Sequence, residues 1–595
     1  MLSPSSALSR LPVAMASLPR SEERRDAFRE LDRLFHAQIA SFTGGLAPSA
    51  LVGALADWAV HLASSPGKQL ELVAALAQAV RDNVTFAIEC AGGADSDPCE
   101  HALPQDRRFR APEWRQYPFN LLAHGFLSVE RWWEAATTGV AGVSRRHQDM
   151  TTFLLRQYLD TLAPSNFAAT NPQVLAQARA QHGMNFVRGG LNFVDDVARS
   201  LSGRPPAGLD TFKVGETVAV TPGKVVRRTA LAEIIQYAPT TREVRPEPVV
   251  IIPAWIMKYY ILDLSPNNSV VRYLTEQGFT VFMVSWKNPG SEDSNTSFDD
   301  YRTEGLLPAL QAALSISGAA RAHMIGYCLG GTLLTAAAAA MARDHDDRVA
   351  SLTLLAAQAD FTEAGELMLF VDEAQISLLE DMMAEHGYLE AGQMAGAFQM
   401  LRSNDLIWSK LVHDYLMGQR DAPIDIMAWN ADATRMPYRM HSEYLRSLFL
   451  NNDLAEGRIK IGGDAIAIED IRAPLFVVGT EQDHVAPWRS VYKFNLMAAN
   501  CEVTFVLTNG GHNAGVLSEP GHAGRHYRAA TRKRDEPYID PDRWFAMHEP
   551  AAGSWWPAWV AWLSARSGAV AAPPPLGDAD FPATDDAPGR YVLMR

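Results

Sequence analysis

Hydrophobic residues recur every three or four positions over the first third of the chain, from about Glu22 to Ser202. This spacing is typical of amphipathic helices. It is clearest in SEERRDAFRELDRLFHAQIASF and QDMTTFLLRQYLDTLA, and turn-forming clusters such as GGADSDP and APSNFAATNP separate the segments. The pattern predicts an all-helical N-terminal domain over residues 21–205, after a disordered leader at residues 1–20.

After residue 205 short apolar runs alternate with helical segments. Six of these runs have the length of strands: PVVIIPAW, TVFMVSW, AHMIGY, SLTLLAA, PLFVVGT and VTFVLTN. Apolar strands separated by helices are typical of a parallel sheet with both faces covered. In KVGETVAVTPGKVVRR, alternating residues predict a further hairpin with its turn at Thr221-Pro222-Gly223. We therefore expect an α/β domain over residues 206–595, with an irregular Pro/Ala/Asp-rich tail.

One connection in this domain is much longer than the others. Roughly a hundred residues separate SLTLLAA from PLFVVGT, whereas a crossover between parallel strands needs only about a dozen. The interval contains helical stretches and a part rich in Trp, Tyr and Met around Trp429. We expect residues 361–470 to form a cap over an active site, with additional structural helices as the alternative.

Composition and charge narrow the possible functions. The chain has 595 residues and a formal net charge of -15, which argues against an extended surface for nucleic acid or anionic membranes. Its few cysteines have no zinc-site spacing and are typical of a reducing compartment; they are Cys90, Cys99, Cys328 and Cys501. The N-terminus lacks the apolar core of a secretory signal, and no apolar run reaches the roughly 18 residues of a membrane span. We expect a cytoplasmic protein without a bound metal.

The strongest chemical signal is the segment IGYCLGG, residues 325–331. Its form G-x-C-x-G-G is that of a nucleophile elbow, the sharp strand-to-helix turn that presents the nucleophile of α/β-hydrolases. Gly326, Gly330 and Gly331 remove side chains where strand and helix come close, and Cys328 takes the place of the nucleophile. The dipole of the following helix favours the thiolate. The pattern predicts an α/β-hydrolase fold with Cys328 as its nucleophile.

This fold places an acid and then a histidine after the nucleophile along the chain. Asp483 follows the expected strand PLFVVGT, and His512 follows the next one, VTFVLTN. Both lie on loops after strands, where such folds present catalytic groups. Asp360, which also follows a strand, is the alternative acid. The sequence therefore predicts a triad of Cys328, Asp483 and His512.

Two backbone N–H groups are needed to hold an oxyanion. One is the amide after the nucleophile, Leu329, and the loop after PVVIIPAW supplies the other, from Ile256 or alternatively Trp255. A thiol nucleophile forms an acyl-enzyme that is itself a thioester and stays activated toward a second nucleophile. The site therefore favours acyl transfer from a thioester of coenzyme A over simple hydrolysis, provided that water is kept out.

Longer motifs extend this interpretation over most of the chain. The chain resembles the class I polyhydroxyalkanoate synthases in DRRFRAPEW, SNFAATNPQVL, YYILDLSPNNSVVRYLTEQGFTVFMVSWKNP, IGYCLGGT, WNADATRMP, EQDHVAPW, GGHNAGV and GSWWPAWVAWL. The similarity covers nearly everything after about the first 20 residues. In that family the cysteine of the lipase-like box and the catalytic aspartate and histidine match Cys328, Asp483 and His512.

The resemblance implies an enzyme that polymerises (R)-3-hydroxyacyl-CoA, with 3-hydroxybutyryl-CoA as the expected monomer, into polyester and releases CoA. It also implies a cytoplasmic homodimer associated with polyhydroxyalkanoate granules. CoA is the acyl carrier and a product, so no bound cofactor is expected. His512 would remove the thiol proton of Cys328, and Asp483 would either orient His512 or help activate the 3-hydroxyl that attacks the acyl-cysteine.

Two alternatives to this function remain at the level of the sequence. They are a thioesterase or polyester depolymerase of the same fold, and a non-enzymatic granule-binding protein. The residues around Trp429 have three interpretations: the lining of an acyl-chain path, a dimer contact and core packing. The N-terminal domain has no nucleophile and base of its own, and its amphipathic helices suit dimer support or docking on the polymer granule.

Overall fold

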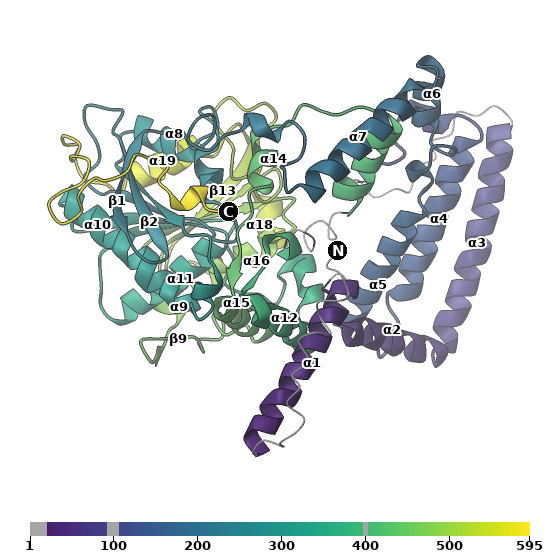
Figure 1. Cartoon of the computed structure of the whole chain (residues 1–595), viewed down its shortest axis with the longest axis horizontal. Helices are drawn as coiled ribbons and strands as arrows, with labels where there is room; N and C mark the ends of the chain where they lie inside the picture. The colour runs from purple at the N-terminus through teal and green to yellow at the C-terminus, as the bar shows by residue number, and fades with distance from the viewer. Residues whose placement is uncertain (1–20, 44, 92–105, 395, 397–402) are drawn as a thin grey trace.

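The structure is a computed structural model. The residues that it describes are 21–43, 45–91, 106–394, 396 and 403–595. A helical N-terminal part lies beside a larger part built on a sheet (Figure 1). The leader expected at residues 1–20 lies outside the described residues, as does Cys99. Among the described helices, none has both the length and the apolar character needed to cross a membrane.

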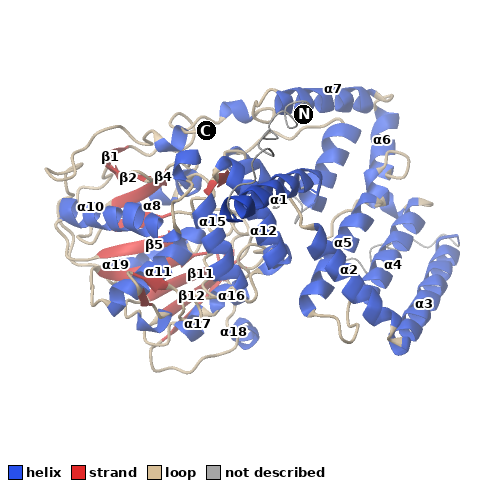
Figure 2. Cartoon of the chain, turned by 60° about the horizontal axis from the view of Figure 1, so that its bottom comes forward, coloured by secondary structure: helices blue, strands red, loops and turns tan. Residues whose placement is uncertain are grey.

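The N-terminal part is built from helices, as the hydrophobic spacing predicts. They are α1 (Ser21–Thr43), α2 (Pro48–Ala63), α3 (Pro66–Ala91), α4 (Phe119–Thr137), α5 (Arg145–Thr161), α6 (Pro172–Ala180) and α7 (Met184–Leu201). Helices α2 to α5 pack side by side as a bundle (Figure 2). Ser144 accepts a hydrogen bond from the His147 amide at the start of α5, and Asn171 caps α6 in the same way.

The motif DRRFRAPEW has a structural role in this bundle. Trp114 is fully buried. Arg108 donates hydrogen bonds to three carboxylates, those of Asp106, Glu130 and Asp160, which come from separate segments. Because a buried guanidinium is stable only when it is paired, these contacts fix the segment against α4 and α5.

A ten-stranded mixed sheet forms the second part. Its strands lie in the order β1-β2-β4-β3-β5-β6-β11-β12-β13-β14. The strands from β4 to β12 in this order are parallel, and antiparallel strands extend both edges. The bounds are β1 (Gly223–Arg228), β2 (Ala232–Tyr237), β3 (Val249–Ile252), β4 (Val281–Trp286), β5 (Ala322–Tyr327), β6 (Val349–Leu355), β11 (Leu475–Thr480), β12 (Val503–Thr508), β13 (His526–Arg532) and β14 (Ala551–Ala552). The six apolar runs that were expected to be strands form the parallel core.

The prediction of a hairpin turn at Thr221-Pro222-Gly223 is wrong. β1 begins at Gly223, so the observed turn between β1 and β2 falls at residues 229–231 instead of Thr221-Pro222-Gly223. Tertiary contacts hold the segment before β1: the Ala219 amide donates to the Asp263 carbonyl, and the Thr221 hydroxyl donates to the Asp263 carboxylate. Local alternation does not encode such contacts, which is why the pattern fails here.

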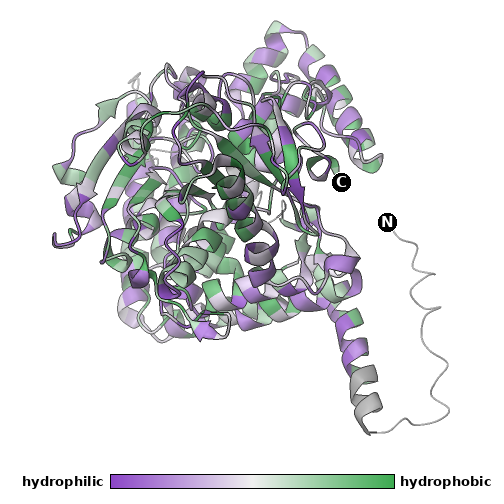
Figure 3. Ribbon diagram, turned by 90° about the vertical axis from the view of Figure 1, so that its left-hand side faces the viewer, coloured by the Kyte–Doolittle hydropathy of each residue, from purple (hydrophilic) through white to green (hydrophobic). Residues whose placement is uncertain are grey.

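Helices cover both faces of the sheet. On one face lie α10 (Leu307–Ser317) and α11 (Leu329–Arg343), and on the other lie α8 (Val270–Glu276) and α19 (Trp556–Ser564). Shorter helices are α9 (Phe298–Tyr301), α16 (Trp488–Tyr492), α17 (Phe494–Met497) and α18 (Pro541–Met547). Val250 and Ile252 of β3 join one core, and Val249 and Ile251 join the other. The central strands are therefore hydrophobic on both sides. Figure 3 colours hydrophobic residues green, and green predominates in the middle of this part.

The long connection between β6 and β11, here called the cap, folds into helices and short strands in its described residues. Its regular elements include α12 (Glu373–His386), β7 (Tyr388–Leu389), α14 (Asp425–Asn430), β8 (Met436–Pro437), α15 (Tyr438–Tyr444), β9 (Lys460–Ile461) and β10 (Asp464–Ala465). Ala433 of the cap pairs with Met257 on the loop after β3, and the Thr434 amide donates to the Ile256 carbonyl. The cap also lies against the N-terminal helices, with α12 along α1.

Candidate active site

Cys328 stands between β5 and α11, on the turn that the glycine pattern predicts. Its φ of 51° and ψ of -125° lie in a region that residues with a β-carbon rarely adopt. The Cys328 carbonyl accepts hydrogen bonds from the Gly331 and Thr332 amides, so the helix starts directly after the cysteine. The thiol is thus held on a strained turn at a helix N-terminus, and the residue stays partly exposed.

The glycines of the elbow occupy positions where a β-carbon would collide. A β-carbon on Gly326 would lie 2.4 Å from the Gly331 Cα, and one on Gly331 would lie 2.4 Å from the Ala357 Cβ. A β-carbon on Gly330 would lie 2.2 Å from the Ile252 carbonyl oxygen. The elbow therefore packs directly against the ends of β3 and β6, and only glycine fits at these contacts.

His512 and Asp483 meet at the ends of β12 and β11. His512 Nδ1 lies 2.8 Å from Asp483 Oδ2, and the Thr480 hydroxyl donates to the same oxygen at 3.0 Å. Asp483 Oδ1 accepts hydrogen bonds from the Val485 and Ala486 amides at 2.9 and 2.8 Å. The Asp483 side chain has no exposed surface. Its carboxylate is therefore fixed in place and bonded to the imidazole.

The charges at the site favour an ionised histidine. Burial lowers the pKa of His512, but the negative charges of Asp483 and Cys328 outweigh it and raise the pKa well above its usual value. Burial raises the pKa of Asp483, yet His512 and two backbone amides lower it overall. Cys328 thus lies close enough to His512 to interact with its charge. A thiol, an imidazole and a buried carboxylate in this arrangement can carry out nucleophilic catalysis with proton transfer.

Asp360, the alternative acid, contacts other residues than His512. Its carboxylate lies 3.2 Å from Lys493 Nζ and accepts a hydrogen bond from the Thr362 amide at 2.9 Å. The structure brings Asp483, and not Asp360, to the imidazole of His512.

The two expected oxyanion donors lie on segments that flank Cys328. Leu329 is the first residue of α11, so its N–H is one of those that a helix leaves without an internal partner. Ile256 lies on the loop after β3, whose start contacts the elbow at Gly330. Thr434 of the cap holds this loop from the other side, because its amide donates to the Ile256 carbonyl and its hydroxyl donates to the Trp255 carbonyl.

Three further residues near the site were not identified from the sequence. Tyr327, directly before Cys328, donates from its hydroxyl to Asn513, directly after His512, and so braces the elbow against the histidine loop. Burial raises the pKa of Tyr444 in the cap, and the charge of Cys328 adds to this rise, so the two side chains interact. Tyr327 and Asn513 are sequence neighbours of Cys328 and His512, and this proximity could have identified them as residues near the site. Tyr444 reaches the site only through the fold of the cap.

Trp429 packs in the core. Its side chain is 4% exposed, and its indole N–H donates to the Lys258 carbonyl at 2.7 Å. Trp429 itself therefore packs in the core, whereas Ile424 and Met427 in the stretch around it are 52% and 49% exposed. The contacts of Trp429 support neither an acyl-chain lining nor a dimer contact.

The other described cysteines differ from Cys328 in their surroundings. Cys501 is buried, and burial raises its pKa to about 12. Cys90 accepts a hydrogen bond from the Asn120 side chain, and burial raises its pKa too. Within the described ranges, no group of three or more His, Cys, Asp or Glu residues is arranged to hold a metal ion.

Comparison with known proteins places the chain in a family. Models described as "Poly-beta-hydroxybutyrate polymerase N terminal" and "Poly-beta-hydroxybutyrate polymerase (PhaC) N-terminus" match residues 26–68 and 105–274, and one for the alpha/beta hydrolase fold matches residues 247–518. A poly(3-hydroxyalkanoate) polymerase of Methylorubrum extorquens is 39% identical over 508 residues, which are 84% of this chain and 83% of that protein. The polymerase subunit PhaC of Rhizobium meliloti is 35% identical over 551 residues, 92% of this chain and 89% of that protein. The corresponding subunit of Cupriavidus necator is 35% identical over 498 residues, 82% of this chain and 83% of that protein. The chain belongs to the poly(3-hydroxyalkanoate) polymerase family.

Proposed function

We propose that the chain is an acyltransferase that polymerises (R)-3-hydroxyacyl-CoA, with 3-hydroxybutyryl-CoA as its monomer, into polyester and releases CoA. The observation that carries the proposal is the thiol of Cys328 on a nucleophile elbow beside the hydrogen-bonded pair of His512 and Asp483. The names of the relatives, which are poly(3-hydroxyalkanoate) polymerases, support the same activity.

The first half-reaction loads the acyl group onto the enzyme. His512 accepts the thiol proton of Cys328, and the sulfur attacks the thioester carbonyl of the substrate. The amides of Leu329 and Ile256 stabilise the oxyanion that forms. The bond between the carbonyl carbon and the CoA sulfur then breaks, and CoA leaves with the proton that His512 held. The acyl group remains on Cys328 as a new thioester.

The second half-reaction forms the ester bond of the polymer. A 3-hydroxyl group attacks the acyl-cysteine and gives its proton to His512. The Cys328 sulfur leaves and recovers a proton. We assign Asp483 the role of orienting His512, because one of its oxygens binds the imidazole and the other binds two backbone amides. A carboxylate with no exposed surface is poorly placed to reach a substrate hydroxyl directly.

Release of CoA alone does not separate this function from the hydrolytic alternatives. Purified protein is therefore incubated with (R)-3-hydroxybutyryl-CoA, CoA release is followed, and the product is identified. The proposal expects polyester in amounts that match the CoA released. Free 3-hydroxybutyrate in its place would indicate a thioesterase, and no CoA release would indicate a non-enzymatic protein.

We also propose that the enzyme acts as a homodimer bound to polymer granules. Exposed apolar side chains on α7 support the granule contact: Leu191 is 65% and Val194 is 63% exposed. Such side chains suit the surface of a water-insoluble polyester. Replacing both residues with lysine should reduce cosedimentation with polymer particles while CoA release in solution is kept. Sedimentation velocity of the wild-type protein tests the dimer.

A further inference from the structure

Besides α12, which lies along α1, an extension of the cap also reaches the N-terminal part. Residues 403–420, here called the cap arm, lie along α7 at a distance from the sheet, and Figure 1 shows this green segment beside α7. The arm contains two π-helical turns, Asn404–Trp408 and Leu411–Leu416. It belongs to the cap by sequence, yet its main contact is with a helix that precedes the sheet.

The arm and α7 fit together at the level of their backbones. A β-carbon on Gly189 of α7 would lie 1.7 Å from the Tyr415 carbonyl oxygen. On the other side of the contact, Gly418 of the arm has a φ of +65°, and a β-carbon there would lie 2.3 Å from the Asn185 carbonyl oxygen. The Asn185 side chain donates to the Leu416 carbonyl at 2.8 Å. Because each element has glycine where the other comes closest, the sequence is adapted to this contact.

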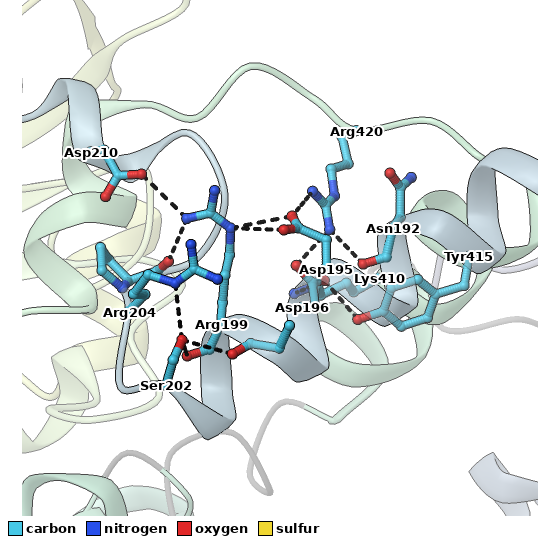
Figure 4. Close-up of polar contacts among 12 residues, drawn as sticks. Asn192, Asp195, Asp196, Arg199, Ser202, Arg204, Asp210, Lys410, Tyr415 and Arg420 are labelled. Atoms are coloured by element: carbon cyan, nitrogen blue, oxygen red, sulfur yellow. Dashed lines mark hydrogen bonds and ion pairs between the residues drawn. The ribbon is translucent and has the colours of Figure 1, made fainter.

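Polar side chains hold the same contact together (Figure 4). Arg420 of the arm donates to Asp195 Oδ2 at 2.9 Å and to Asp196 Oδ1 at 2.6 Å. The Tyr415 hydroxyl donates to Asp196 Oδ2 at 2.8 Å. Lys410 Nζ lies 3.3 Å from the same oxygen. Hydrogen bonds between charged groups that are partly buried are stronger and more directional than those on an open surface.

The arm leads directly into the part of the cap that borders the active site. α14 follows the arm at Asp425, and the next segment pairs with the loop of the proposed oxyanion donor through Thr434 and Ile256. Further along, Tyr444 interacts with Cys328. A shift of the arm would therefore move the cap segments that contain Thr434 and Tyr444.

We infer that α7 positions the cap for the polymerase reaction by clamping the cap arm. The inference rests on the proposed function. Gly189, Asp196, Tyr415 and Arg420 are positioning residues, since they act on the cap and not on the reacting atoms. When the contact between α7 and the cap arm is lost, a smaller fraction of molecules has the cap in the arrangement that binds substrate. The apparent affinity for acyl-CoA falls by that fraction, whereas the chemical step in the bound complex does not change.

A pair of neighbouring glycines gives the test. Gly189→Ala and Gly190→Ala, made in the full-length protein, add the same methyl group to the same helix. Nothing lies within 4 Å of a β-carbon on Gly190, whereas one on Gly189 collides with the arm. For Gly189→Ala we expect amide hydrogen exchange of residues 403–420 to rise about tenfold, the KM for (R)-3-hydroxybutyryl-CoA to rise about tenfold, and kcat to stay within about twofold. Gly190→Ala should match the wild type in all three.

Variants of Arg420 provide an independent check if Gly189→Ala does not fold. Arg420→Met removes the charge and should show the same rise in KM. Arg420→Lys keeps the charge and should recover most of the wild-type KM, although it loses the forked geometry of the guanidinium. Unchanged exchange of residues 403–420 in both Gly189→Ala and Arg420→Met would overturn the clamp. Faster exchange with an unchanged KM, or a fall in kcat alone, would overturn the positioning role. Because exchange is measured without substrate, the clamp is tested even if the wild type makes no polymer.

Discussion

His512 Nδ1 and Asp483 Oδ2 lie 2.8 Å apart, although the two residues are 29 positions apart in the sequence. The contact exists because β11 and β12 are parallel neighbours in the sheet, so the loops after both strands emerge at the same edge. With Nδ1 bonded to the carboxylate, Nε2 is the nitrogen left to exchange a proton with the thiol.

Asp483→Asn should reduce kcat for CoA release by about a hundredfold to ten-thousandfold. The amide removes the negative charge that raises the pKa of His512 and no longer holds the imidazole in one orientation. Steady-state kinetics measure the loss, and circular dichroism shows whether the fold is intact. Asp360→Asn is the matched control, because Asp360 binds Lys493 at the end of another strand. An equal loss in both variants would contradict the assignment of the acid.

Gly330→Ala should destabilise the protein by about 1–3 kcal/mol and impair activity, since the β-carbon would meet the Ile252 carbonyl oxygen at 2.2 Å. Gly53→Ala is the control. Gly53 also lies in a helix, but nothing is within 4 Å of a β-carbon there, so this change should stabilise by about 0.5–1 kcal/mol. Denaturant unfolding of the two variants measures both effects. We expect the free energy of unfolding to fall in Gly330→Ala and to rise in Gly53→Ala. An equal rise in both variants would contradict the steric explanation of the elbow glycine.

The strands, the elbow and the candidate triad follow from local sequence signals. The strand β5 is a continuous apolar run, and Cys328 comes directly after it between glycines. Asp483 and His512 come three and four positions after the ends of two more such runs. Since the order of groups along the chain is known for this fold, their meeting could be predicted once the strands were recognised.

Features that depend on tertiary contacts could not be predicted in the same way. β13 has the sequence HYRAATR, which is polar and incompletely buried, because it lies near the edge of the sheet. The turn at Thr221-Pro222-Gly223 has the composition of a hairpin, but Asp263 holds this segment in another conformation. The contact between Gly189 and Tyr415 joins segments more than two hundred residues apart, and no local pattern indicates it.

A buried histidine in the cap should make stability depend on pH. Burial lowers the pKa of His441 to about 4, below its usual 6.5. The unfolded chain therefore binds a proton before the folded protein does. The stability that this neutral histidine contributes is fully present above pH 6.5 and is lost as the pH falls toward 4, by up to about 3 kcal/mol.

His441→Met should flatten this dependence, because the variant has no group to protonate at this buried position. Denaturant midpoints from pH 7 to pH 4 measure the slope. His522→Gln is the control, since His522 is exposed and pairs with Glu519. If His441→Met lost stability with acid as steeply as the wild type, another group would have to account for the loss.

The covalent acyl-enzyme on Cys328 is the central claim, and mass spectrometry of the peptides after a short reaction tests it most directly. Protein is mixed with (R)-3-hydroxybutyryl-CoA, quenched in acid, digested and analysed, with Cys328→Ala treated in parallel. We predict hydroxybutyryl groups on the peptide that contains Cys328, none on the peptides of Cys90 or Cys501, and no polymer from Cys328→Ala. Polymer made by Cys328→Ala at the wild-type rate, or acyl groups on another cysteine alone, would contradict the account.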